Sequence, residues 1–199
     1  MTLHFFVEEP SAERALKHLL PRIVDCEFEF FVFNGKPDLL RRLPDRLRSY
    51  AGWAVSAGVK VVVVVDRDAD DCRELKARLE KMSDQAGLVS SGSGPTVLNR
   101  IVVEELESWL LGDVEALRRA YPRLPVGLAA QARFRDPENV PGGCWEALEY
   151  VLQQHGYYQV GLSKGRLAED VAQHMDVENN QAPSFRAFRD GVRRLAGER

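Results

Sequence analysis

The sequence predicts an α/β protein in which a mostly parallel sheet is flanked by helices and followed by a helical C-terminal extension. Three observations support this class. Short apolar runs rich in strand-forming residues alternate with leucines at helical spacing over the first half of the chain. Residues 61–65 are all valine, as expected for a strand covered on both faces in a parallel sheet. After about Asp113 the strand signals end, and helical patterns alternate with loops.

The first part of the chain predicts two strands, each followed by a helix. Residues 3–7 form an apolar run that ends at two glutamates, and Ser11 is a suitable N-cap for the helix that follows. Residues 28–33 form the second apolar run. We expect the helix after it to be interrupted near Pro44, since proline disrupts helical hydrogen bonding.

Two further strands follow with the same alternation. The valine run stops at Asp66, and residues 70–85 have the spacing of a helix. After a glycine- and serine-rich loop, residues 97–103 predict a fourth strand that runs directly into a helical pattern at 104–113. Strands that alternate with helices in this way predict parallel pairing through right-handed crossovers.

The length of 199 residues favours one domain with a helical appendage. We expect an α/β core over residues 1–125 and a helical extension over residues 126–199, packed on the core as one structural unit. Within the extension, two helices have apolar faces, and the residues that form them are Trp145, Leu148, Val151 and Leu152 in one and Phe185, Phe188, Val192 and Leu195 in the other.

Composition restricts both the compartment and the mode of binding. The net charge of −3 and the pI near 5.9 give no global attraction to nucleic acid, so such binding would need a local basic surface or phosphates bridged by a metal. The N-terminus lacks the pattern of a signal peptide, and no segment has the roughly 20 apolar residues that span a bilayer. The three cysteines form no CxxC pair. We therefore expect a cytoplasmic protein with reduced thiols.

Acidic residues follow three of the predicted strands, at the edge of a parallel sheet where ligands gather. Asp66 and Asp68 are two residues apart, so in extended backbone both side chains would share a face. Their oxygens suit Mg²⁺ or Mn²⁺. Glu8, at the end of the first strand, would be a third ligand or the general base for an attacking water. Asp70 and Asp71 are explained by the positive end of a helix dipole.

Additional site residues are expected after the second and fourth strands. Either Glu104 or Glu105 would support a second metal ion. Glu105 lies at the margin of the apolar face of the helix that is expected there, whereas Glu104 and Glu107 lie away from it. Lys36 follows the second strand at the same edge and is expected to contact a phosphate.

A glutamate after the first strand, followed by DxD after a later buried strand, resembles the Toprim fold of topoisomerases, primases and OLD-type nucleases. Nearly the whole chain also resembles the bacterial family called domain of unknown function 4276, which is similar to Toprim nucleases. The stretches that carry this resemblance are FVEEPSAE, FNGKPDLLRRLPDRLR, VVVVVDRDADDC, VLNRIVVEELESWLLGD, RFRDPENVPGG and SFRAFRDGVRRL.

The resemblance implies that Glu8, Asp66 and Asp68 form a metal site. It also implies a link to antiphage defence and to ATPases, beside which related Toprim-like proteins often act. Many Toprim proteins have glycine directly after the first glutamate, whereas this chain has Glu9, which adds charge to the turn.

These observations together predict a Mg²⁺- or Mn²⁺-dependent nuclease, or another phosphodiester-processing enzyme, that acts on nucleic acid, with DNA as the expected substrate and RNA left open. The expected partners are nucleic acid, an ATPase and a second copy of the chain. Two alternatives stay open. The chain could be a non-catalytic partner or regulator of an ATPase that uses its acidic patch for contact. It could also be a metal-dependent phosphatase, since an aspartyl nucleophile in a DxD pair also follows a buried strand.

Overall fold

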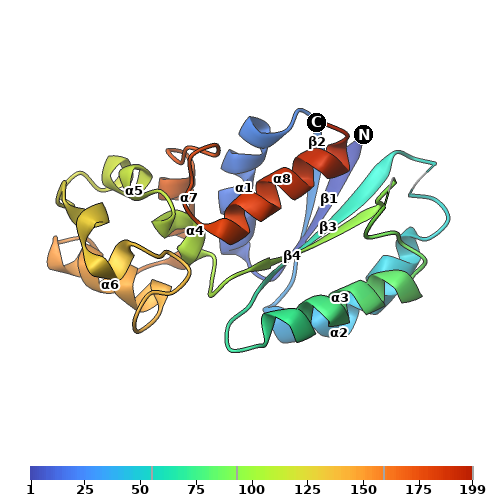
Figure 1. Ribbon diagram of the computed structural model, residues 1–199, viewed down its shortest axis with the longest axis horizontal. Coiled ribbons are helices and arrows are strands. Elements are labelled where there is room, and N and C mark those ends of the chain that lie inside the picture. The colour runs from blue at the N-terminus through green and yellow to red at the C-terminus, as the bar shows by residue number, and fades with distance from the viewer. Residues whose placement is uncertain (55, 93, 159, 199) are drawn as a thin grey trace.

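A computed structural model describes residues 1–54, 56–92, 94–158 and 160–198 and contains a parallel sheet of four strands. The order across the sheet is β2-β1-β3-β4 (Figure 1). The strands are β1 (Thr2–Val7), β2 (Glu27–Val32), β3 (Val59–Asp66) and β4 (Val97–Val102). The predicted fold class, an α/β sheet flanked by helices, is therefore confirmed.

The strand order places a topological switch point at the centre of the sheet. From β1 the chain first moves outward to β2 and then returns to the other side of β1 to form β3. Val7, the last residue of β1, is in register with Val32 of β2 and Val64 of β3, so these strands end at the same edge. In sheets of this type, ligands bind where the order reverses, outside the carboxyl ends of the strands.

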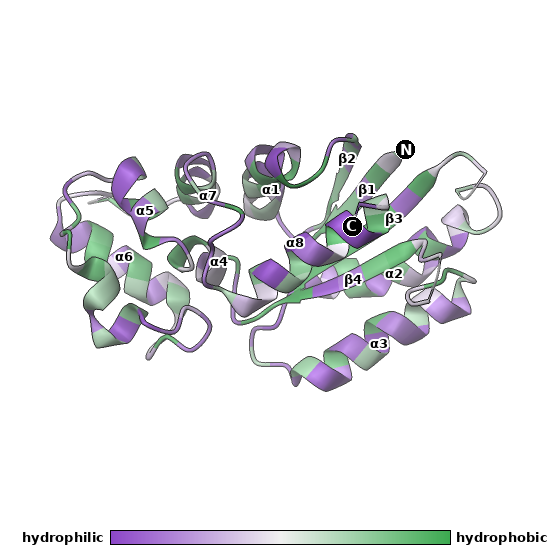
Figure 2. Ribbon diagram, turned by 45° about the horizontal axis from the view of Figure 1, so that its top comes forward, coloured by the Kyte–Doolittle hydropathy of each residue, from purple (hydrophilic) through white to green (hydrophobic). Residues whose placement is uncertain are grey.

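Helices cover both faces of the sheet. This is expected for a parallel sheet, in which successive side chains of a strand point to opposite faces and both faces are apolar. One face is covered by α1 (Pro10–Ile23) and α8 (Pro183–Ala196), and the other by α2 (Lys36–Tyr50) and α3 (Cys72–Gln85) (Figure 1). Neighbouring residues of β1 separate accordingly, with Phe5 in the core beside α1 and Phe6 in the core beside α2. Figure 2 shows that the strands are mostly apolar, whereas α3 alternates apolar and polar residues.

The remaining helices form a layer beyond the carboxyl edge of the sheet (Figure 1). They are α4 (Glu107–Leu111), α5 (Val114–Ala120), α6 (Cys144–Gln154) and α7 (Lys164–Ala172), with 3-10 turns at Leu128–Ala130 and Ala132–Phe134. In this layer α7 packs against α1, and α8 then returns to lie on β4. The chain after residue 125 therefore shares one hydrophobic core with the chain before it.

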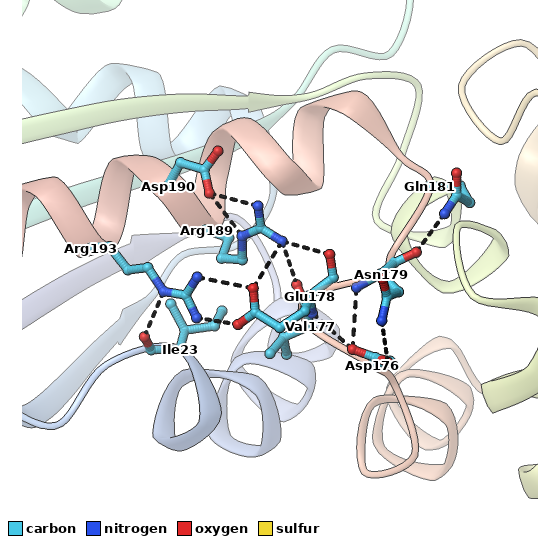
Figure 3. A network of polar contacts seen from close by, with 9 residues as sticks. All are labelled: Ile23, Asp176, Val177, Glu178, Asn179, Gln181, Arg189, Asp190 and Arg193. Carbon is cyan, nitrogen blue, oxygen red and sulfur yellow. Dashed lines mark hydrogen bonds and ion pairs between the residues drawn. The ribbon is translucent and has the colours of Figure 1, made fainter. Parts of the chain in front are cut away.

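Polar contacts also tie the C-terminal helix to the rest of the molecule (Figure 3). Arg193 of α8 donates to the Ile23 carbonyl at the end of α1, over 3.1 Å, and forms an ion pair with Glu178. One turn earlier, Arg189 donates to the carbonyls of Val177 and Glu178 over 3.0 and 2.9 Å. These contacts hold the loop after α7 against α8.

Two local expectations are wrong. Helix α1 begins at Pro10 with Glu9 in the N-cap position, because proline suits the first turn, and the Ser11 hydroxyl donates to the Glu9 carboxylate instead of capping. Helix α2 runs through Pro44 without a break. Its apolar face, which includes Leu43 and Leu47, is buried against the sheet, and this packing offsets the lost hydrogen bond.

The cysteines and the helix lengths agree with the sequence analysis. The three thiols are free, with Cys144 buried and Cys72 exposed. Within the described parts of the chain, no helix has the length and apolar character needed to cross a membrane.

Candidate functional site

The strongest convergence of acids lies at the switch point between β1 and β3. Glu8 follows β1 directly, and Asp66 is the last residue of β3. The Glu8 carboxylate accepts a hydrogen bond from the backbone N–H of Asp66. The Glu8 carbonyl in turn accepts from the N–H of Gly35, over 2.9 Å, which fixes this turn against the one before α2. The Glu8 side chain thus lies against the backbone of Asp66, whereas a metal site formed by their two carboxylates stays a prediction.

Both carboxyl groups are held in an environment that disfavours their charged form. Burial raises the pKa of Glu8 to about 7, although the hydrogen bond from Asp66 acts in the opposite direction. Burial also raises the pKa of Asp66 well above its usual range, and the nearby charges of Glu8 and Glu107 add to this effect. Neighbouring carboxylates of this kind require a proton or a cation to offset their repulsion.

The backbone between Asp66 and Asp68 is not extended. The N–H groups of Arg67 and Asp68 donate to the carbonyls of Val102 and Glu104, over 2.8 and 3.0 Å, and Asp68 takes a left-handed conformation with φ of 48°. Aspartate tolerates this conformation better than most residues. The expectation that Asp66 and Asp68 share a face of extended backbone is therefore wrong.

Asp68 instead forms an ion pair with Lys36, the first residue of α2. The Lys36 ammonium lies 2.7 Å from Asp68, 2.8 Å from Asp70 and 2.9 Å from the Arg67 carbonyl. Burial of Lys36 opposes its charge, but the hydrogen bonds to both aspartates prevail and raise its pKa. Lys36 therefore joins the loop after β3 to the start of α2. Its predicted contact with phosphate stays a prediction.

The two acids expected to support a second metal ion are each paired with a basic side chain. Glu104, with φ of 66°, forms an ion pair with Arg67. Glu105 accepts a hydrogen bond from the Lys164 ammonium over 3.0 Å. The segment 103–106 is not helical, and α4 begins only at Glu107. Because the helix begins later than expected, Glu107 is the buried acid in place of Glu105.

Glu107 is the residue that sequence reasoning missed, because it was placed away from the apolar face. It is only 1% exposed, and neither oxygen of its carboxylate has a hydrogen-bond partner in the described part of the chain. Burial raises its pKa to about 7, although the Lys164 ammonium, 3.9 Å away, acts in the opposite direction. The available signal was that Glu107 is the one charged residue in the run 106–111, because every residue of α4 is buried.

The site as a whole is a buried acidic centre with a basic rim. Glu8 and Asp66 form the centre, and Glu107 lies close enough for its charge to raise the pKa of Asp66. Asp68 and Glu105 face lysines at the rim. Among the described residues, no three histidine, cysteine, aspartate or glutamate side chains are grouped as a ready-made metal cage.

Residues 7–193 match the family described as Domain of unknown function (DUF4276). The chain belongs to the DUF4276 family. The matched range of this DUF4276 protein includes the whole acidic centre and both rim lysines. Comparison with curated proteins and with solved structures gave no match.

The chemistry that the DUF4276 site can perform follows from its charges. A carboxyl group with a pKa of about 7, such as Glu8, can accept or release a proton in the neutral range. Buried carboxylates without full hydrogen bonding also attract hard cations, which prefer oxygen ligands. Acid-base work and cation binding are therefore the two functions that this arrangement favours.

Proposed function

We propose that this DUF4276 protein is a Toprim-like, Mg²⁺- or Mn²⁺-dependent enzyme that processes phosphodiester bonds of nucleic acid, with DNA as the expected substrate. The observation that carries the proposal is the meeting of Glu8 and Asp66 at the switch point of the sheet. Burial raises the pKa of both carboxyl groups and so favours their uncharged form. A bound dication would offset the charge of the ionised form.

The side chains present fit a hard divalent cation. Mg²⁺ keeps several waters and commonly takes one or two protein carboxylates together with substrate phosphate oxygens. A complete cage of three side chains is therefore not required. Asp66 and Glu8 would hold the ion, and the unpartnered carboxylate oxygens of the nearby Glu107 support a site that lacks positive charge. When bound, the metal would supply Lewis-acid activation of water and stabilise charge on the phosphate.

The chain's own residues would position the reactants. Glu8, whose pKa lies near 7, is suited to accept a proton from water at its carboxylate. Lys36 already directs its ammonium group to three acceptors, so it can bind a phosphate only if one of them leaves. Asp68 is one such acceptor, and its side chain is 53% exposed. A turn of Asp68 toward the metal would free Lys36 for phosphate.

The experiment is a calorimetric titration of the metal-free protein with Mn²⁺ and Mg²⁺, followed by a DNA cleavage assay. We expect the wild type to bind, and Asp66→Asn to lose at least tenfold in affinity and all metal-dependent cleavage while staying folded. Asp84→Asn, at an exposed position on α3, is the matched control and should behave like the wild type. Cleavage by Asp66→Asn at the wild-type rate would refute the assignment. Turnover of phosphomonoesters with indifference to DNA would indicate a phosphatase instead.

A second candidate is a non-catalytic partner or regulator, for instance of an ATPase. The ion pairs at the rim favour this candidate. An acid that is paired with a basic side chain of the same chain is less available as a metal ligand. These pairs are Asp68 and Asp70 with Lys36, Glu104 with Arg67, and Glu105 with Lys164. Absence of metal binding by the wild type, or the same binding after loss of Asp66 and Asp68, would support this candidate over the enzyme.

A further inference from the structure

We propose that Glu107 is a cation ligand of the acidic centre and that the Lys164 ammonium is a built-in positive charge which a divalent cation displaces. This inference rests on the proposed function, because it concerns the same centre. It replaces Glu104 and Glu105 with Glu107 as the acid that completes the metal site.

The state of Glu107 is the first support. Buried carboxylates in folded proteins nearly always have hydrogen-bond partners, since an unpaired one lowers stability. Glu107 is 1% exposed, and both of its oxygens lack such a partner in the described part of the chain. The Lys164 ammonium forms an ion pair with this carboxylate at 3.9 Å, beyond hydrogen-bond distance. A carboxylate kept in this state is suited to a ligand that arrives from outside the chain.

The position of Glu107 relative to Asp66 is the second support. Asp66 ends β3, and Glu107 begins α4, shortly after β4, the strand that pairs with β3. Asp66 is in register with Val102, five residues before Glu107, so both acids follow the carboxyl ends of neighbouring strands, and the charge of Glu107 raises the pKa of Asp66. Glu104, by contrast, forms an ion pair with Arg67 on a left-handed backbone.

Lys164 has the properties of a displaceable counter-ion. Its ammonium lies 3.0 Å from Glu105, 3.9 Å from Glu107 and 5.1 Å from the centre of the Trp145 ring. The side chain is 36% exposed, so solvent reaches it. Lys36, on the other side of the centre, is 11% exposed and has three acceptors. The two lysines therefore differ: Lys36 is less exposed and has more hydrogen-bond acceptors than Lys164.

The balance of charge explains why displacement would be favourable. The single charge of Lys164 lies beyond hydrogen-bond distance of Glu107, so it offsets that carboxylate only partly. A divalent ion bound directly between Glu107 and Asp66 would offset both. The ligand class is a hard dication such as Mg²⁺ or Mn²⁺, because the donors are carboxylate oxygens.

The test measures Mn²⁺ affinity by calorimetry and the melting temperature with and without Mn²⁺, so it does not depend on enzymatic activity. Glu107→Gln should bind Mn²⁺ at least tenfold more weakly than the wild type, and its metal-free melting temperature should be equal or higher. Glu104→Gln is the matched control, with wild-type affinity expected. Lys164→Met should bind Mn²⁺ at least threefold more tightly, because no ammonium has to be displaced.

Each outcome separates this inference from the proposed function. No Mn²⁺ binding by the wild type would overturn both. Binding that is lost in Asp66→Asn but unchanged in Glu107→Gln would overturn only the role of Glu107. A fall in the metal-free melting temperature of Glu107→Gln, or failure to fold, would show a structural carboxylate and overturn that role too. Equal or weaker Mn²⁺ binding by Lys164→Met would overturn the displacement.

Discussion

Replacing Glu8 with glutamine should stabilise the metal-free protein at neutral and alkaline pH but not at acidic pH. The pKa of Glu8 rises from an ordinary 4.5 to about 7, chiefly because the side chain is 8% exposed. Below pH 4.5 the group is protonated in both the folded and the unfolded chain. Between these two values the unfolded chain loses its proton first, so the free energy of unfolding falls as pH rises. At about 1.36 kcal/mol per pKa unit, the full loss above pH 7 is about 3 kcal/mol.

Glutamine keeps the oxygen that accepts from the Asp66 N–H, so the variant removes the charge and little else. The assay is urea denaturation of wild type and Glu8→Gln at pH 4 and pH 8 in buffers free of divalent cations. We expect equal stability at pH 4 and a gain of up to about 3 kcal/mol for the variant at pH 8. Glu198→Gln, at an exposed position, should change stability by less than about 0.5 kcal/mol at both. A variant less stable than the wild type at pH 8 would refute the reasoning.

Two further predictions concern the support of the site. The buried Ser184 hydroxyl accepts a hydrogen bond from the Trp109 indole over 2.8 Å, so Ser184→Ala should leave that N–H unpaired and cost about 1–3 kcal/mol of unfolding free energy in urea denaturation. Asp71 caps α3 by accepting from two backbone N–H groups, and Asp71→Ala should lower stability by about 1 kcal/mol, measured in the same way. If both variants have the wild-type free energy of unfolding in urea, the hydrogen bonds assigned to these residues contribute nothing.

The strands were predictable because a short run of consecutive apolar residues is enough to indicate a buried strand. The run 61–65 is apolar at every position since β3 is covered on both faces, and the structure extends it only to 59–66. Pro44 misled the prediction for α2 because the stability of that helix comes from packing on the sheet, which local propensity does not contain.

The centre of the site was predictable for a similar reason. Parallel strands that pair end at the same edge, so Glu8 and Asp66 had to lie near each other once β1 and β3 were neighbours. Asp68 and Glu107 were not predictable in this way. The direction of Asp68 depends on hydrogen bonds from the segment 67–68 to residues more than thirty positions later. The burial of Glu107 depends on α6 and α7, which are still more distant in the chain.

The placement of the acids implies that the fold and the site make opposing demands. Three carboxyl groups, on Glu8, Asp66 and Glu107, have pKa values raised by burial, so each favours a protonated centre over a charged one. A protein selected for stability alone would gain by replacing them with apolar or amide side chains. A cation that binds only the folded state reverses this, because it stabilises that state by mass action. A functional metal centre therefore predicts that stability rises with added dication and that it rises less when any of the three acids is removed. Buried acids without a function would show neither effect.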